Sequence, residues 1–177
     1  AKEFYILVTG LSTLQKGATS DHLRQLAILQ LKAIEKLGDS LTHLSPQDQY
    51  TIRLANVVAQ KETGNTKEAL LLLENLTQSF PKSLAAQALL AETLQQTNTA
   101  PNLAASLDKF RQLTHKCRPN TEPWFRAKYG VARTLLLQGK KEEAAQRIQY
   151  LQLTSSALKT STWNDRFGQL LLECQNK

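Results

Sequence analysis

One pattern occurs twice in the chain and limits the folds that are open to it. Residues 62–76 read ETGNTKEALLLLENL and residues 136–151 read LLQGKKEEAAQRIQYL, which places Gly64 and Gly139 75 residues apart. Around both glycines apolar residues recur every three to four positions, the period of an amphipathic helix. A helix that stops at a glycine and is followed at once by another helix forms an antiparallel hairpin. The pattern therefore predicts helical hairpins that repeat along the chain.

Start and stop signals extend the helical pattern over the rest of the sequence, and no segment shows the sustained alternation of a strand. Ser45 and Pro46, with Asp48 three residues after the serine, form a helix N-terminus with an acidic variant of the capping box. Gly64-Asn65 is typical of a C-terminal cap. We expect about nine helices joined by loops of about two to six residues. The clearest ranges are 2–16, 20–37, 46–63, 83–97, 122–138 and 162–175.

A small residue followed by two large apolar residues recurs at three places in the second helices of the expected hairpins. The three sets are Ala69, Leu73 and Leu76; Ser106, Phe110 and Leu113; and Ala144, Ile148 and Leu151. Their first members are 37 and 38 residues apart. A small side chain lets the two helices of a hairpin approach closely, and the large ones fill the space toward the next hairpin. We expect all three sets to lie in the core.

These residues resemble the tetratricopeptide repeat, whose standard period is 34 residues. The likeness is best in residues 50–81 and 122–153 and weaker in 83–119, where Asn98-Thr99 stands at the position of the expected turn glycine. The resemblance implies an all-α fold, a right-handed superhelix of antiparallel hairpins. It also implies that the first helix of each hairpin lines a concave groove that holds segments of partner proteins.

On this reading, residues 1–177 form a single repeat domain, with a last helix that caps the stack. A repeat stack needs such a cap, because the apolar face of its last hairpin would otherwise remain exposed. The chain contains no methionine, so we interpret it as a segment of a larger protein, without assigning a compartment. The hairpins are predicted at about 2–38, 46–80, 83–117 and 122–154, and the capping helix at about 162–175.

The net charge of +7 is placed unevenly. Residues 1–100 carry nine Lys and Arg against nine Asp and Glu, whereas residues 101–177 carry thirteen against six. This asymmetry favours an acidic partner for the second half of the chain. The alternative is a solvated basic face that aids solubility.

The sequence contains no catalytic, cofactor or metal motif that we can support. His22, His43 and His115 lack metal-ligand spacing, and no glycine-rich phosphate loop is present. Ser79 and Lys82 match a serine-lysine motif, but Ser79 ends a helix before Pro81 in a chain without strands, so we interpret the match as fortuitous. Two cysteines, Cys117 and Cys174, are too few for a disulfide framework; each is expected to be buried, and a bond between them remains open. We therefore predict a protein that is not an enzyme.

The candidate partner-binding residues lie on two neighbouring first helices. Arg126, Tyr129 and Arg133 share one face of a helix, because they are spaced i, i+3 and i+7. Two guanidinium groups beside a phenol can hold a carboxylate or a phosphate. Counting along the expected groove adds Glu92 and Gln95 from the neighbouring hairpin. The alternative is that Tyr129 packs inside while the arginines pair with solvent or with the glutamates at 142 and 143.

The sequence thus predicts a non-catalytic module that binds a protein or peptide segment, with acidic segments among the candidates. A first alternative is a nucleic-acid or acidic-ligand surface in the second half of the chain. The residues that would contact phosphates are Lys109, Arg111, Lys116, Arg118, Arg126, Lys128 and Arg133. A second alternative is a spacer or assembly domain. No apolar run approaches the roughly 20 residues of a membrane span.

Overall fold

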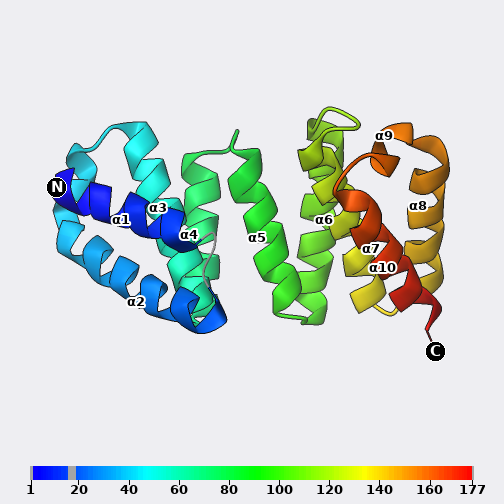
Figure 1. Cartoon of the computed structure of the whole chain (residues 1–177), viewed down its shortest axis with the longest axis horizontal. Helices are drawn as coiled ribbons and strands as arrows, with labels where there is room; N and C mark the ends of the chain where they lie inside the picture. Colours follow the sequence, from blue (N-terminus) through cyan, green and yellow to red (C-terminus); the bar gives the residue numbers. More distant parts are fainter. Residues whose placement is uncertain (1, 16–18, 177) are drawn as a thin grey trace. The chain divides into compact units, whose positions relative to one another are not determined.

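The computed structural model describes residues 2–15 and 19–176, and this part of the chain contains ten α-helices, one short 3₁₀ helix and no strand (Figure 1). The prediction of an all-α protein is confirmed. Contacts between Cα atoms group the chain into two units, Ala1–Ala86 and Gln87–Lys177.

The first unit is built from four α-helices and the 3₁₀ helix η1. In it α1 packs on α2 and α3, and α3 packs on α4. One cluster of its buried core consists of Val8, Ala33, Leu37, Ile52 and Ala55, which come from the first three α-helices. The bounds are α1 Lys2–Gln15, α2 Ser20–Leu37, η1 Gly38–His43, α3 Pro46–Glu62 and α4 Thr66–Ser79.

Polar contacts fix the ends and the interior of these helices. The Ser45 hydroxyl accepts a hydrogen bond of 3.1 Å from the backbone N–H of Asp48, as its position before Pro46 predicts. The buried Gln30 side chain donates to the Val8 carbonyl at 3.0 Å and to the Ser12 hydroxyl at 2.6 Å. A buried amide without partners would destabilise the fold, so these bonds hold α2 in register on α1.

The second unit contains the larger part of α5, whose first three residues belong to the first unit. Here α7 packs on α6 and α8, and α10 packs on both α7 and α8. The four-residue helix α9 and the 3₁₀ helix η1 were not expected from the sequence. The bounds are α5 Leu84–Gln96, α6 Ala100–Lys116, α7 Glu122–Leu137, α8 Lys141–Thr154, α9 Ser156–Lys159 and α10 Trp163–Gln175.

The three predicted sets of core residues in α4, α6 and α8 are all buried. Ala69, Ser106 and Ala144 have no exposed surface, and the large residues that follow them are exposed by 5% or less. Ser106 also donates a 2.8 Å hydrogen bond to the carbonyl of Ala91, so α5 and α6 lie close together there. At Ser106 the small residue therefore marks a tight approach between the two helices of its hairpin.

The turns between these helix pairs share one backbone feature. Gly64, Asn98 and Gly139 have φ angles of 87°, 52° and 78°, in the left-handed region. Glycine enters this region without steric cost, and asparagine is among the few other residues that do so readily. Asn98, which interrupts the sequence pattern, thus makes the same kind of turn as the two glycines.

Candidate functional site

The predicted binding residues Arg126, Tyr129 and Arg133 lie on the side of α7 that meets α5 and α10. The Arg126 guanidinium donates from Nε to Glu92 Oε1 at 2.6 Å and from Nη2 to Oε2 at 2.8 Å. Both side chains are about one third exposed, at 35% and 29%. The hydrogen bonds to Glu92 raise the pKa of Arg126 above its usual value. This two-bond geometry is the strong form of an arginine-carboxylate contact.

Gln95 lies one turn after Glu92 and also reaches α7. Its Nε2 atom donates to the Thr134 hydroxyl at 2.7 Å and to the Gly130 carbonyl at 3.2 Å. Thr134 is fully buried. Glu92 and Gln95 therefore bind α7 along one edge of α5, and both belong to the predicted set.

Tyr129 and Arg133 face the last helix instead. The Tyr129 ring lies 5.5 Å from the centroids of both Trp163 and Phe167, in tilted and edge-on contacts. Arg133 donates through Nη1 to Glu173, with 34% and 49% of the two side chains exposed. Tyr129 thus packs on the α10 aromatics, and the carboxylate beside Arg133 comes from α10.

The structure therefore brings all five predicted residues to one surface, formed by α5, α7 and α10. It also gives each guanidinium a carboxylate partner, from Glu92 and Glu173 and not from the glutamates at 142 and 143. We call this surface the paired face of α7. Its use in binding a partner stays a prediction.

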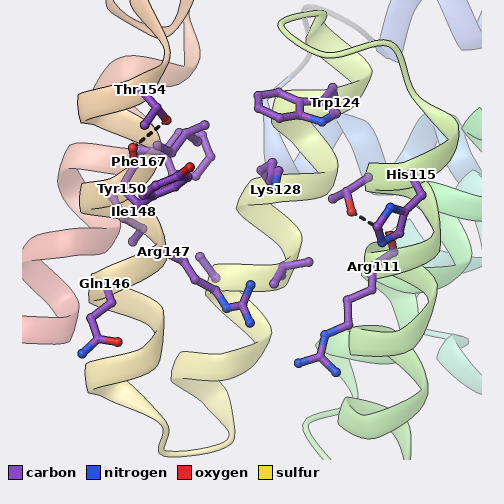
Figure 2. A pocket seen from close by; sticks show the side chains of 14 residues that line it. Arg111, His115, Trp124, Lys128, Gln146, Arg147, Ile148, Tyr150, Thr154 and Phe167 are labelled. Atoms are coloured by element: carbon purple, nitrogen blue, oxygen red, sulfur yellow. Dashed lines mark hydrogen bonds between the residues drawn. The ribbon is translucent and has the colours of Figure 1, made fainter.

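On its other side, α7 borders a cavity of about 600 Å³ between α6 and α8 (Figure 2). Each of the three helices contributes one cation: Arg111 from α6, Lys128 from α7 and Arg147 from α8. Figure 2 shows the Arg147 side chain extending from α8 toward α7. We call this site the basic cavity.

The charges in the basic cavity are not balanced. Arg147 pairs with Glu143 one turn earlier on α8, with a closest distance of 2.8 Å. Within the described ranges, Arg111 and Lys128 form no ion pair. Burial, and secondly the charge of Arg147, lower the pKa of Lys128. The charged form of this lysine is therefore less favourable here than in water.

Aromatic and apolar side chains complete the basic cavity. Lys128 Nζ lies 5.0 Å from the centre of the Trp124 ring, within the range of a cation–π contact. Tyr150 is 70% exposed, whereas Ile148 and Phe167 are buried. The cavity therefore offers a flat apolar surface next to its cations.

Sequence reasoning found only part of this site. It grouped Arg111 and Lys128 with five other basic residues as phosphate contacts, and it assigned no role to Arg147 or Tyr150. The available signal was spacing, because Arg147 and Tyr150 are three residues apart on one helix face. The spacing of Arg147 and Tyr150 does not show which neighbouring helix this face of α8 contacts.

The described residues contain no group of three or more His, Cys, Asp or Glu side chains that could hold a metal ion. Cys117 and Cys174 are free and buried, and burial raises the pKa of both thiols. Over residues 2–15 and 19–176, no helix combines the length and the apolar character needed to cross a bilayer.

Comparison with protein-family models, with curated proteins and with solved structures finds no match to the chain.

Proposed function

We propose that the chain is a non-catalytic helical-repeat module that binds a segment of a partner protein along the paired face of α7. The observation that carries this proposal is the ladder of acid–base pairs across α5, α7 and α10. Glu92 of α5 pairs with Arg126 of α7, and Arg133 of α7 pairs with Glu173 of α10. Between 29% and 49% of each of these four side chains is exposed. Partly exposed pairs of this kind can exchange a carboxylate of the protein for one of a ligand.

The proposed architecture is a right-handed, tetratricopeptide-like superhelix in which α3, α5 and α7 are first helices and α10 caps the stack. Three features support it. The hairpins share a left-handed turn residue, at Gly64, Asn98 and Gly139. They share a buried small residue in each second helix. The inner side of α10 buries Trp163, Phe167 and Leu170, as a capping helix would.

The partner class follows from the charges on the paired face. Two guanidinium groups flank Tyr129, so an extended segment with acidic side chains could displace Glu92 and Glu173 from them. Each displacement replaces an ion pair within the chain with an ion pair between the chain and its partner. The net gain in free energy is then small for each pair, and specificity comes from the spacing of the acidic groups.

The test must separate recognition from folding, because Arg126 also joins α5 to α7. We would compare three forms of the chain as bait in lysate of the source cell, with and without nuclease treatment, read by mass spectrometry. They are the wild type, Arg126→Glu/Arg133→Glu, and a swapped form that adds Glu92→Arg and Glu173→Arg. The swapped form restores both ion pairs with opposite polarity.

A protein retained by the wild type, and by neither of the other two, would support recognition by the guanidinium groups. If the swapped form recovers the partner together with its stability, the pairs are structural and the binding surface is elsewhere. Identical partner lists for all three forms would favour a spacer or assembly role. Binding that disappears with nuclease would favour nucleic acid.

A further inference from the structure

The basic cavity has a charge surplus that the fold does not use. Its three cations come from three helices, so their approach is a product of tertiary packing and not of a run of basic sequence. The carboxylate of Glu143, which pairs with Arg147 and also interacts with the charge of Arg111, offsets one of the three positive charges and leaves a surplus of two. By contrast, both arginines on the paired face have carboxylate partners.

Holding these cations together has a cost in stability. Lys128 is partly buried near Arg147, and both conditions disfavour its charged form. The cation–π contact with Trp124 acts against this cost. A perturbed cation in a cavity is a feature of binding sites, where the ligand supplies the missing charge.

The form of the cavity indicates the ligand. Its volume of about 600 Å³ lies within the range of small-molecule sites, roughly 300–1,000 Å³. Tyr150 is exposed at its edge, and Ile148 and Phe167 provide apolar surface. The cavity therefore suits a ligand with a planar ring and one compact anionic group.

The surplus charge favours a phosphate monoester over a carboxylate as that anionic group. A phosphate monoester carries a charge of about −1.5 to −2 at pH 7 and has three terminal oxygens, which cations on three sides can contact separately. A carboxylate has a single negative charge and two oxygens, and one guanidinium is enough to bind both.

We propose that the basic cavity binds a phosphate monoester of a planar ring, with the phosphate between Arg111, Lys128 and Arg147 and the ring against Tyr150. The ring is that of a phosphorylated tyrosine side chain or of a nucleoside monophosphate, which share this chemistry. The cavity lies on the opposite side of α7 from the paired face, so this inference is independent of the proposed function.

The experiment is isothermal titration calorimetry on the whole chain at low ionic strength. The two probes are phenyl phosphate, for the tyrosine source, and adenosine 5′-monophosphate, for the nucleotide source. Inorganic phosphate measures the affinity for the phosphate group alone, and phenol measures the affinity for the aromatic ring alone. We expect one of the two esters to bind at least about tenfold more tightly than either fragment, because each half adds about 1.4 kcal/mol or more.

Variants locate the binding. Arg147→Gln is expected to weaken binding of the preferred ester about tenfold, which is typical for loss of a hydrogen bond between charged groups. Tyr150→Ala, at an exposed position, should weaken the ester but not inorganic phosphate. Arg118→Gln changes an exposed basic residue outside the cavity and should leave both affinities unchanged.

Three results would overturn the inference. The first is that neither ester binds at millimolar concentration. The second is that Arg118→Gln and Arg147→Gln weaken binding of the preferred ester equally. The third is that phenol binds as tightly as the preferred ester. A single-stranded oligonucleotide that binds more tightly than the esters, with an affinity that Arg118→Gln reduces as much as Arg147→Gln, would also overturn it in favour of a general nucleic-acid surface. Because Tyr150→Ala removes an exposed side chain, the test stands even if a variant of a cation fails to fold.

Discussion

The two sides of α7 carry similar cations in opposite electrostatic settings. On the paired face, Arg126 and Arg133 each bind a carboxylate from a neighbouring helix. In the basic cavity, Lys128 lies over the Trp124 ring, and the charge of Arg147 disfavours its charged form. On the paired face, Glu92 and Glu173 therefore link α7 to its neighbouring helices. In the basic cavity, Glu143 is the acidic residue that pairs with one of the three cations.

This difference teaches how to read a basic stretch of sequence. A guanidinium with a carboxylate on an adjacent helix contributes to stability, and an external anion must displace that carboxylate to bind. A cation without such a carboxylate partner lowers stability slightly and remains free to bind an external anion. Net charge alone, +7 for this chain, does not distinguish the two cases.

The largest effect is expected at the contact that sets the spacing of α6 and α7. A Cβ atom on Gly130 would lie 2.4 Å from the Phe110 ring, which is itself buried. Gly130→Ala should therefore lower the free energy of unfolding by about 3 kcal/mol, through overpacking of the core. Urea denaturation followed by circular dichroism measures this value.

Gly168→Ala is the matched control, since Gly168 is also helical but has open space around its Cβ position. It should stabilise the protein by up to about 1 kcal/mol through helix propensity. If both variants change the free energy of unfolding by a similar amount, α6 and α7 are not in close contact at Gly130. The contact between Gly130 and Phe110 would then not set the width of the basic cavity.

The next effect is expected on the paired face. Arg126→Glu places two carboxylates together at a partly buried site and should cost about 2 kcal/mol, less than for a fully buried pair because both side chains are about one third exposed. Adding Glu92→Arg should recover more than half of the loss. Arg133→Glu is expected to cost less, about 1 kcal/mol, because its partner Glu173 is 49% exposed.

Chemical denaturation of the wild type, Arg126→Glu, Glu92→Arg and the double variant forms a double-mutant cycle that measures the coupling between Glu92 and Arg126. A coupling near zero would contradict the structural role of the pair and remove the contrast between the two sides of α7.

Lys128→Met tests the basic cavity and should change stability in the opposite direction. Replacing the disfavoured charge by an apolar side chain is expected to raise the free energy of unfolding at pH 7 by less than about 1 kcal/mol, since solvent still reaches the site. The folded-state pKa of Lys128 is lowered, so between it and the unfolded value the unfolded state binds more protons. The wild type should therefore gain stability as pH rises through this window, and the advantage of the variant should shrink.

Urea denaturation at neutral and at alkaline pH measures both effects, with Lys109→Met, on α6 and outside the cavity lining, as control. A clear loss of stability in Lys128→Met would mean that its contact with Trp124 outweighs the burial of its charge.

The smallest effect on stability is expected from Glu143→Gln. Hydrogen bonds from Arg147 lower the pKa of Glu143, so the pair stabilises the fold above the usual glutamate pKa and loses this contribution as pH falls through the lowered value. A pair spaced i, i+4 contributes only about 0.3–0.5 kcal/mol. The same change frees Arg147 and should tighten binding of the preferred ester about two- to threefold, a change that calorimetry resolves. Unchanged affinity would mean that Arg147 does not contact the anion.

The sequence by itself determined the helical class and the positions of most helices. Ser45 with Pro46 and Asp48 defined a helix start because capping depends on neighbours along the chain. Gly64 and Gly139 defined turns because only a few residue types adopt positive φ readily. The buried sets that begin at Ala69, Ser106 and Ala144 were identified in the same way, by helical spacing.

Tertiary structure alone decided which charges meet. Arg126 and Glu92 are 34 residues apart, and no local rule selects that carboxylate over the nearer ones at 142 and 143. Lys128 and Arg147 lie on different helices. Helical spacing places each residue on one face of its own helix, but it does not show which faces of the two helices meet. Electrostatic partners depend on distance in space, whereas caps, turns and helical period depend on distance along the chain.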